Sequence, residues 1–595
     1  MSKGRNDVGT IIVEGIGAAP GRALGTLHRL DIDVPVAEHR TIAPEDVEAE
    51  VRRFEEARRA ARERLEVLAA ETGDRFGQYE GRMFEAQVLM IDDPVIVEGT
   101  RAYIRENFLA AERAFDLQML EQRVRRLDSG QSMLIDRLSD LHDIRLSVLS
   151  ALLDLPETDL PADGAEPLIL VARDFPPSLA ARLDAARFVG FVTERGSRAG
   201  HAVLIARSLG IPAVVGVGSA LGSLAHGERA LVDGRTGTVV VDPSEQEVES
   251  YRRGRARTAE RQRTLAELPN DRPTRTVDDV DVVIQANVDR PDEVARAKAL
   301  GAAGVGLLRS EFLVIGHREI PSEAEQYEAY RAALEAFPDG EVVLRTFDIG
   351  GDKFPIFLEM PREENPYLGW RAIRVCLDLP DLFLNQLRAA VRAAVHGNLK
   401  ILLPFVTSVD EIERTRALID RVYAELGDAA PTRRVPVGIM VETPAAVELL
   451  DRMAPHVDFV SLGTNDLTQY VLAADRGNAK LAGIFEPLHP ALLAQYRRIV
   501  RACRAHDLPA GVCGELAGEP AGLAVLLGLG FTQFSISLST LAEQREVARN
   551  VSVAELTELV AAADWADGRA CRVEVTDYLV GRGALDQETA RLSGE

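Results

Sequence analysis

The C-terminal half of the chain contains eight apolar segments that read as strands, and six of them end on a side chain that can bind an ion or move a proton. Each such side chain follows an apolar run that would otherwise be pure core. The residues are Asn287, Arg309, Arg345 with Asp348, Glu442, Asn465 with Asp466, and Cys513 with Glu515. A single one could be a polar group in a loop, but six together indicate a shared pocket.

Several of these side chains suit the chemistry of a phosphorylated acid. Arg309 and Arg345, together with Arg476 further along the chain, offer forked donors for bidentate contacts with phosphate and carboxylate. Glu442 and Asp466 are hard oxygen ligands of the kind that Mg²⁺ takes alongside substrate oxygens and water. A metal ion with arginines is the electrostatic arrangement used in phosphoryl transfer. We therefore expect a Mg²⁺-dependent site for a small, doubly anionic substrate.

Two neutral side chains complete this predicted pocket. Asn465 can donate a hydrogen bond to phosphate without adding charge. Cys513 lies between glycines in GVCGELAG, which favours a thiol that faces the pocket. Such a thiol could donate or accept a proton if its pKa suits. A buried structural cysteine is the alternative.

A second candidate centre surrounds His201, in the segment ERGSRAGHAVLIARSLGIPAVVG. A glycine-bearing loop leads to a histidine at the start of an apolar helix. Free backbone N–H groups and the positive dipole end at that position favour a phosphoryl group, and a histidine ring nitrogen can carry one covalently. None of the other nine histidines has this setting. We predict that His201 is a nucleophile, with capping or core packing as the ordinary alternative.

The elements that must position the first pocket are strands that alternate with helices. The strand candidates are 281–288, 304–310, 341–350, 400–406, 436–443, 458–466, 509–515 and 533–537. Eight such units favour a (β/α)₈ barrel, in which the active site lies at the C-terminal ends of the strands. A doubly wound open sheet is the alternative.

The N-terminal half has a different pattern. Short β-branched runs precede residue 31 and return after residue 155. Between them, apolar residues recur every three or four positions, which predicts about four helices, one of them over 95–127. We therefore expect a multidomain α/β chain. Its parts are a small α/β domain of 1–30 plus 155–242, an inserted helical bundle over 31–154, a helical linker over 243–272, a barrel over 273–575, and a C-terminal extension over 576–595.

Composition narrows the class of protein. The chain has 69 Lys and Arg against 93 Asp and Glu, a formal charge of −24, which argues against a nucleic-acid binder. The four cysteines have no C-x-x-C spacing, so neither a disulfide framework nor a zinc site is expected. The N-terminus has no apolar signal region and no apolar run reaches the ~18 residues that span a bilayer, so a cytoplasmic location is expected.

Long motifs connect these observations to a known family. They are GVGLLRSEFL, LRTFDIGGDK, ENPYLGWRAIR, VGIMVETPAA, SLGTNDLTQYVLAADRGN, GVCGELAG and HAVLIARSLGIPAVVG. Nearly the whole chain resembles enzyme I of the phosphoenolpyruvate-dependent sugar phosphotransferase system. The resemblance implies a swivelling phosphohistidine domain, an inserted helical domain that docks the phosphocarrier protein HPr, and a C-terminal barrel that binds phosphoenolpyruvate and forms a homodimer. It also implies a hinge, for which residues 244–268 are the candidate.

The resemblance also implies a role for each matching residue. His201 is the residue phosphorylated, at Nε2, and Cys513 is the acid that protonates the enolate to pyruvate. Glu442 and Asp466 hold Mg²⁺. The implied contacts of phosphoenolpyruvate are Arg309, Arg345, Asn465, Asp466 and Arg476, with Lys353 of IGGDK and Arg371 of GWRAIR as further contacts.

Two positions depart from the family pattern. The family usually has Thr-Ser before the active histidine, whereas Ala199-Gly200 precede His201 here. A hydroxyl contact to the phosphohistidine is therefore missing or replaced, with Ser197 as the candidate substitute. In the docking insert, Gln87 of MFEAQVLMIDDP stands where the family often has histidine, which bears on the carrier that is recognised.

Three rival functions differ in what they require. Phosphoenolpyruvate synthase and pyruvate phosphate dikinase need an ATP-binding domain ahead of the histidine domain, and residues 31–153 are too short and too helical for one. A nitrogen-related paralogue would carry an N-terminal sensory domain, which we do not expect here. A non-catalytic carrier-binding paralogue is disfavoured by the full set of strand-end residues, although Ala199-Gly200 keeps it open.

Overall fold

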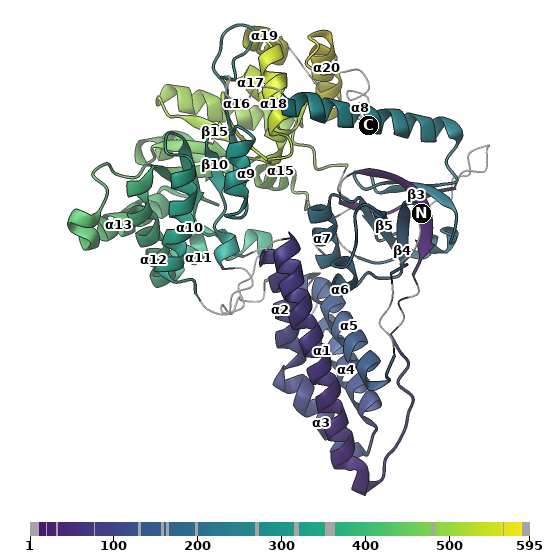
Figure 1. The fold of residues 1–595 in the computed structure, drawn as a ribbon. Helices are drawn as coiled ribbons and strands as arrows, with labels where there is room; N and C mark the ends of the chain where they lie inside the picture. Colours follow the sequence, from purple (N-terminus) through teal and green to yellow (C-terminus); the bar gives the residue numbers. More distant parts are fainter. Residues whose placement is uncertain are drawn as a thin grey trace. The chain divides into compact units, whose positions relative to one another are not determined.

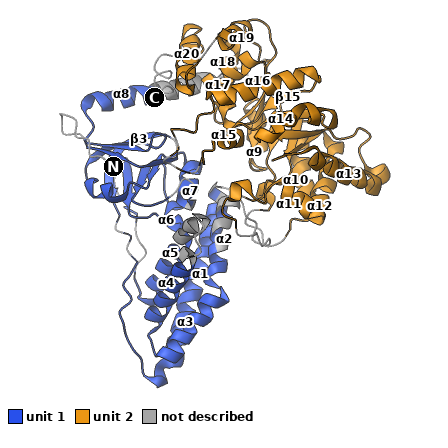
Figure 2. Cartoon of the chain, turned by 180° about the vertical axis from the view of Figure 1, so that it is seen from behind, with its two compact units in different colours: residues 1–257 blue, residues 258–595 orange. Residues whose placement is uncertain are grey.

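The computed structural model forms two compact units, residues 1–257 and 258–595, each of which is described by itself (Figure 2). The described residues are 11–19, 21–30, 32, 34–76, 78–128, 132–155, 160–161, 166–196, 200–267, 273–314, 320–350, 363–476, 478, 481, 483–562 and 565–585. No helix in this described part combines the length and the apolar character needed to cross a membrane.

The first unit contains one eight-stranded sheet, in the order β1-β8-β7-β3-β4-β5-β6-β2. Three of its strands precede the helical insert in the sequence and five follow it. The strands are β1 (Ile11–Glu14), β2 (Ile16–Ala19), β3 (Arg22–Arg29), β4 (Leu168–Ala172), β5 (Phe188–Thr193), β6 (Ala213–Val215), β7 (Arg229–Asp233) and β8 (Thr238–Val241). In the middle of the sheet β3 pairs in parallel with β4, Thr26 opposite Leu168. The whole helical insert therefore lies between two neighbouring strands. The short helices α6 (Pro177–Ala180) and α7 (His201–Leu209) belong to the same unit.

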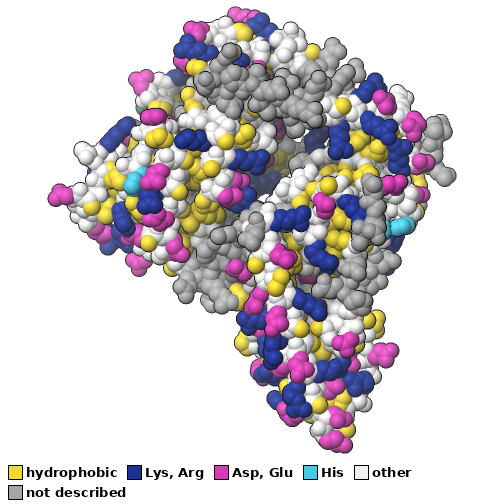
Figure 3. All heavy atoms as spheres, viewed as in Figure 1, with side chains coloured by type: hydrophobic (Ala, Val, Ile, Leu, Met, Phe, Trp, Pro, Cys, Tyr) yellow, Lys and Arg dark blue, Asp and Glu magenta, His cyan; other side chains and the backbone are white. Residues whose placement is uncertain are grey.

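The insert is a bundle of helices that lie side by side (Figure 1). They are α1 (Val47–Phe76), α2 (Gln78–Ile91), α3 (Pro94–Asn107), α4 (Ala111–Asp128) and α5 (Ser132–Leu152). The expectation of one helix over 95–127 is wrong, because Phe108 takes a left-handed φ of 51° and Leu109 bridges to Thr41. Acidic and basic side chains are interspersed over the bundle (Figure 3), as in the ion pairs of Arg101 with Glu55 and Glu98. The polar helix α8 (Glu245–Glu267) follows β8.

The second unit is built on a closed barrel of eight parallel strands, because β9 pairs with both β10 and β16. The strands are β9 (Val283–Val288), β10 (Val305–Leu308), β11 (Glu341–Arg345), β12 (Asn398–Leu403), β13 (Val437–Val441), β14 (Phe459–Leu462), β15 (Ala510–Val512) and β16 (Gln533–Ile536). All eight predicted strand regions contribute a strand. The predicted (β/α)₈ barrel is confirmed, and the open-sheet alternative is wrong.

Helices enclose this barrel. They are α9 (Glu293–Ala299), α10 (Glu323–Ala336), α11 (Ile373–Asp378), α12 (Pro380–Ala393), α13 (Val409–Leu426), α14 (Pro444–Met453), α15 (Thr464–Leu472), α16 (Pro490–Ala505), α17 (Pro520–Leu529), α18 (Leu541–Asn550), α19 (Val553–Ala562) and α20 (Gly568–Gly581). Local sequence sets some of their ends: Ser322 with Glu325 and Ser408 with Glu411 form capping boxes before α10 and α13. Helix α17, PAGLAVLLGL, is apolar on all sides and fully buried.

The interior of the barrel holds a separate apolar cluster. Its members are Leu307, Val343, Leu402, Met440, Phe459 and Cys513. These side chains fill the interior of the barrel, so the barrel has no open channel among the residues that the structure describes. The functional groups must therefore come from the strand ends and the loops that follow them.

The expected boundary at residue 575 falls inside α20. Val575 and Leu579, four positions apart on this helix, are both buried in the barrel unit's core, and so are Ala584 and Leu585. The folded part thus continues at least to residue 585, because these apolar side chains would otherwise be exposed to water. Residues 586–595 of the expected extension lie outside the described residues.

The first prediction concerns Asp278, which ties the start of the barrel unit to α19. Its carboxylate accepts hydrogen bonds from Thr276 Oγ1 (2.6 Å), Ser552 Oγ (3.0 Å), and the N–H groups of Val553 (3.0 Å) and Ala554 (2.9 Å). Burial opposes ionisation, but these hydrogen bonds lower the pKa of Asp278 overall. Asp278→Ala should cost about 1–2 kcal/mol at pH 7, as for the loss of a helix cap.

This stabilisation has a defined pH dependence. Because the folded pKa is lowered, the contribution is fully present above the unfolded pKa of about 4 and is lost as the pH falls through the folded value. Urea unfolding of the full chain between pH 7 and pH 3 measures it. The matched control is Asp279→Asn, which changes an exposed ion pair with Arg275 and should cost less than about 0.5 kcal/mol. Equal losses for both variants would contradict the assignment.

Candidate active site

Arg345 anchors the candidate site at the end of β11. Its side chain is 6% exposed, with Nη2 2.5 Å from Oε1 of Glu311 and Nη1 3.4 Å from Oδ2 of Asp348. Burial lowers the pKa of Arg345, but the charges of Glu311 and Asp348 raise the pKa above its ordinary value overall. The guanidinium therefore stays charged while buried. Glu311, three residues after β10, also accepts a hydrogen bond from the Asp348 N–H (3.2 Å).

A second buried arginine continues these ion pairs. Nη2 of Arg371 lies 2.8 Å from Oδ1 of Asp348 and 3.3 Å from Oδ2 of Asp466. Arg476, which is partly exposed, places Nη1 3.3 Å from Oδ1 of Asp466. The result is a continuous alternation of charges. It runs through Glu311, Arg345, Asp348, Arg371, Asp466 and Arg476, so five residues predicted from the sequence lie together.

Glu442, the residue after β13, is a further buried carboxylate. Its Oε1 accepts a hydrogen bond from the Phe405 N–H at 2.6 Å. Burial and then the negative charges of Asp466 and Asp348 raise the pKa of Glu442 to about 8. Gly463 makes room for this side chain, because a Cβ there would lie 2.9 Å from Oε2 of Glu442. The glutamate thus lies in a pocket where a neighbouring cation would favour its charged form.

The charges of this site are unbalanced in a way that fits a divalent cation. Among the described residues of the site, four carboxylates but only two guanidiniums are at least nine-tenths buried. They are Glu311, Asp348, Glu442 and Asp466, against Arg345 and Arg371. No cluster of three or more His, Cys, Asp or Glu suited to a metal occurs in the described part of the chain. Two carboxylates with substrate and water completing the shell is an arrangement that suits Mg²⁺.

Cys513 follows β15 and faces the barrel interior. Its side chain packs in the apolar interior cluster, and its Sγ lies 3.6 Å from the Leu462 carbonyl oxygen. Burial raises the pKa of Cys513 to about 11, with a further upward contribution from the charge of Glu442. The thiol therefore carries its proton at neutral pH, as a proton donor must. The thiol is buried in the apolar interior cluster, as the structural alternative expects, and it lies within the electrostatic reach of Glu442; its role as an acid stays a prediction.

The remaining predicted residues lie at the rim. Arg309 pairs with Asp289 at 2.9 Å and is partly exposed. Asn287 donates to the Cys513 carbonyl oxygen (3.3 Å) and accepts from Ser535 Oγ (2.7 Å), so it holds strand ends together. Oδ1 of Asn465 accepts from the Glu515 N–H at 3.2 Å, which orients the amide.

Three residues near the ion pairs were missed by the sequence analysis. Glu311 directly follows Arg309-Ser310 in an otherwise apolar segment, and that position was the available signal. The hydroxyl of Tyr470 accepts from Nη1 of Arg371 (3.1 Å), and the ring of Phe405 lies 4.6 Å from Cζ of the same arginine. No local pattern marks these two aromatic residues.

The second predicted centre is only partly described. Gly200 is the N-cap of α7, whose first residue is His201, and Gly210 ends this helix with φ 70°. The loop–histidine–helix setting is therefore present. The His201 side chain, Ser197, Ala199 and, in the barrel unit, Lys353 lie outside the described residues.

Gln87 is a buried structural residue and not a surface docking residue. It is fully buried on α2, and its Nε2 donates to Oδ1 of Asp140 at 3.1 Å and to Oδ2 of Asp143 at 3.5 Å, both on α5. Asp143 in turn accepts from the Ser178 N–H of α6 at 3.0 Å. This position therefore joins the bundle to the α/β domain of the same unit.

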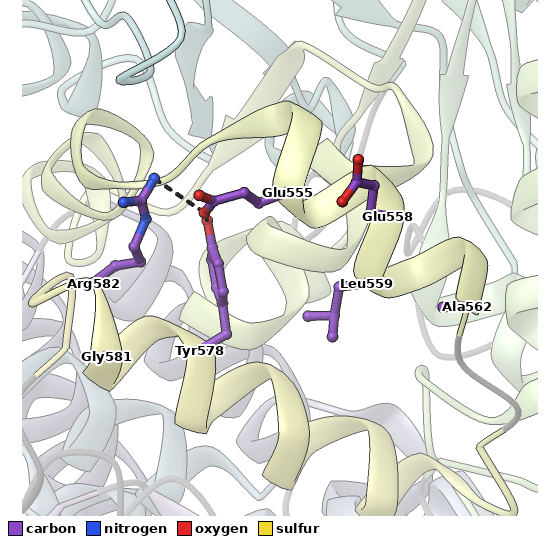
Figure 4. Close-up of a pocket in the computed structure, with 7 residues that line it drawn as sticks. All are labelled: Glu555, Glu558, Leu559, Ala562, Tyr578, Gly581 and Arg582. Carbon is purple, nitrogen blue, oxygen red and sulfur yellow. Dashed lines mark hydrogen bonds and ion pairs between the residues drawn. The ribbon is translucent and has the colours of Figure 1, made fainter.

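A surface groove of about 590 Å³ lies elsewhere on the barrel unit, between α19 and α20 (Figure 4). Its lining comprises Glu555, Glu558, Leu559, Ala562, Tyr578, Gly581 and Arg582. Glu555 accepts from the Tyr578 hydroxyl (2.9 Å) and pairs with Arg582 (3.0 Å). None of the predicted site residues lines this groove.

Comparison with known proteins shows the family of the chain. Three family models match: the PEP-utilising enzyme N-terminal domain over residues 14–137, the mobile domain over 164–237 and the PEP-binding domain over 263–553. The last of these spans the barrel strands that carry the buried ion pairs.

Relatives that match along most of their length point to the same family as the domain models. A phosphoenolpyruvate-protein phosphotransferase of Geobacillus stearothermophilus is 37% identical over 549 residues, which cover 92% of this chain and 94% of the relative. One from Haloferax volcanii is 39% identical over 582 residues, covering 97% and 99%. With this identity along almost the whole of both chains, the protein belongs to the phosphoenolpyruvate-protein phosphotransferase family and is an enzyme of the transferase class.

Proposed function

We propose that the chain transfers the phosphoryl group of phosphoenolpyruvate to its own His201 and then to a histidine of the carrier HPr. Pyruvate is released, and the reaction is the first step of sugar uptake by the phosphotransferase system. The single observation that carries this proposal is the buried alternation of carboxylates and arginines at the strand ends, from Glu311 to Arg476. Such a site suits a small ligand with two anionic groups.

The arginines supply the substrate contacts in this proposal. Phosphoenolpyruvate carries a phosphate and a carboxylate, and forked guanidiniums match both. The proposed contacts are Arg309, Arg345, Arg371, Asn465, Asp466 and Arg476, with Lys353 as a further one. Asp348 keeps Arg345 and Arg371 paired and oriented, so little rearrangement is needed when the ligand binds.

Glu442 and Asp466 would hold Mg²⁺. The excess of buried carboxylates over buried guanidiniums supports this assignment. When bound, the ion would neutralise charge on the substrate oxygens. The protein's own contribution is to keep both carboxylates at the strand ends, Glu442 through the Phe405 N–H and Asp466 through Arg371.

The proposed chemistry uses one nucleophile and one acid. A bond forms between His201 Nε2 and phosphorus as the bond between phosphorus and the enol oxygen breaks. The Cys513 thiol then gives its proton to the methylene carbon of the enolate, which yields pyruvate. The raised pKa of Cys513 supports this role, because the thiol is protonated when the leaving group needs a proton.

The proposal also assigns the parts of the chain. Residues 1–30 plus 155–242 would be the phosphohistidine domain and 31–154 the HPr-docking domain. The expected 273–575, extended at least to residue 585 by α20 and the buried residues after it, would be the catalytic and dimerisation domain of a cytoplasmic homodimer. The two half-reactions require His201 to meet first the barrel and then the carrier. The stretch 243–272, which contains α8, is the candidate hinge.

The second prediction tests the first half-reaction. Intact mass after incubation with phosphoenolpyruvate and Mg²⁺ should show one acid-labile phosphoryl group on the wild-type chain. His201→Ala removes the nucleophile and Glu442→Ala removes a metal ligand, so both should show none, and a chelator should abolish the wild-type adduct. Glu555→Ala, in the groove between α19 and α20, is the control that should label normally. A folded wild-type chain that takes no label would favour a carrier-binding paralogue without catalysis.

The third prediction concerns Cys513. Cys513→Ala should lower the rate of pyruvate formation by about 10²-fold, the usual contribution of a general acid. Because the pKa of Cys513 is raised to about 11, the wild-type rate should show no loss from thiol ionisation up to about pH 9. The matched control is Cys503→Ala, a buried cysteine on α16 that should leave the rate unchanged. Equal rates for the wild type and Cys513→Ala would refute the assignment of the acid.

A further inference from the structure

Phe405, two residues after β12, has an unusual backbone conformation. Its φ is +59°, and its side chain is only 3% exposed. A bulky aromatic residue rarely adopts the left-handed region, because its Cβ crowds the backbone. Strained residues of this kind persist where the surrounding structure holds them, and they gather at functional sites. We therefore expect the contacts of Phe405 to serve the nearby site.

Its backbone is held by the candidate metal ligand. The Phe405 N–H donates to Oε1 of Glu442 at 2.6 Å, and both residues are buried. A cation beside Glu442 would favour the charged carboxylate, and the charge would strengthen this hydrogen bond. This contact offsets part of the backbone strain and fixes where the ring lies.

The ring contacts one of the proposed substrate arginines. Cζ of Arg371 lies over the Phe405 ring at 4.6 Å from its centroid, and Cζ of Arg374 lies at 4.8 Å. The Tyr470 ring meets the Phe405 ring edge-on at 5.7 Å, and its hydroxyl accepts from Nη1 of Arg371 at 3.1 Å. Cation–π attraction is strongest where both partners are shielded from water, as Phe405 and Arg371 are.

Several contacts together orient the guanidinium of Arg371. Asp348 and Asp466 bind its Nη2 and Tyr470 binds its Nη1. Carboxylates alone leave a guanidinium free to tilt about its ion pairs. The Phe405 ring, lying against the guanidinium, removes that freedom.

We propose that Phe405 is a positioning residue that sets the guanidinium of Arg371 for the anionic substrate. The inference rests on the proposed function in one respect, since it takes Arg371 to be a contact of phosphoenolpyruvate. In its left-handed conformation the N–H of Phe405 reaches Glu442 and the ring lies against Arg371. Phe405 thereby links the metal carboxylate to the substrate arginine.

The test is the affinity for phosphoenolpyruvate of full-length chains that carry His201→Ala, so that no phosphoryl group is transferred. Calorimetric titration with phosphoenolpyruvate and Mg²⁺ gives the dissociation constant. Phe405→Leu keeps an apolar side chain and the N–H but loses the aromatic face, so the dissociation constant should rise about tenfold. Phe405→Tyr keeps the face and should stay within about twofold of the parent.

Phe383→Leu is the matched control. Phe383 is fully buried in the core of the same unit, on α12, so its loss weakens packing by a similar mechanism. It should leave the dissociation constant unchanged. Thermal unfolding of all variants verifies that each is folded.

The outcomes separate this inference from the proposed function. An unchanged affinity of Phe405→Leu or an equal weakening in Phe383→Leu would overturn the role of Phe405 alone. A parent chain that binds no phosphoenolpyruvate would overturn both the role of Phe405 and the proposed function. Normal binding by the parent together with no phosphoryl label on the chain with His201 intact would instead overturn the proposed function and leave the positioning role standing.

Discussion

The burial of four carboxylates beside two guanidiniums at the end of the barrel is the constraint on which the second unit depends. Each buried charge carries a large desolvation cost unless it is paired and hydrogen-bonded. The alternation from Glu311 through Arg345, Asp348 and Arg371 to Asp466 meets this requirement for most of them. It leaves the Glu442 carboxyl with its pKa raised to about 8, and a bound cation would favour the charged form of this group.

These ion pairs require that the loops after the strands keep fixed positions. Hydrogen bonds between the loops and a helix of the barrel unit hold them in place. Gln386, fully buried on α12, donates to Ser310 Oγ (3.0 Å) and accepts from the Phe347 N–H (3.1 Å). Ser310 in turn donates to the Arg345 carbonyl oxygen (2.8 Å). The loops after β10 and β11 are thereby fastened to one helix. A satisfied buried network of this kind gives a unique geometry.

The first unit carries a long helical insert within its small α/β domain. The insert follows β3 and precedes β4, and these two strands are parallel neighbours in the sheet. The insert therefore does not interrupt the pairing of the strands. Gln87, Asp140 and Asp143 connect the bundle to α6. All three polar side chains are buried. Their residue types alone therefore could not show whether they face a partner at the surface or pack inside the unit.

The sequence by itself determined the barrel and most of the residues at its strand ends, because apolar period and strand-terminal polarity are local properties that burial in a parallel sheet imposes. Glu442 and Arg345 were found in that way. Which charges pair depends on the folded barrel, since Glu311 meets Arg345 and Arg371 meets Asp466 through its closure and not through any spacing along the chain. The tertiary structure also decided the left-handed conformation of Phe405, which no propensity favours and which its contacts in the folded site hold in place.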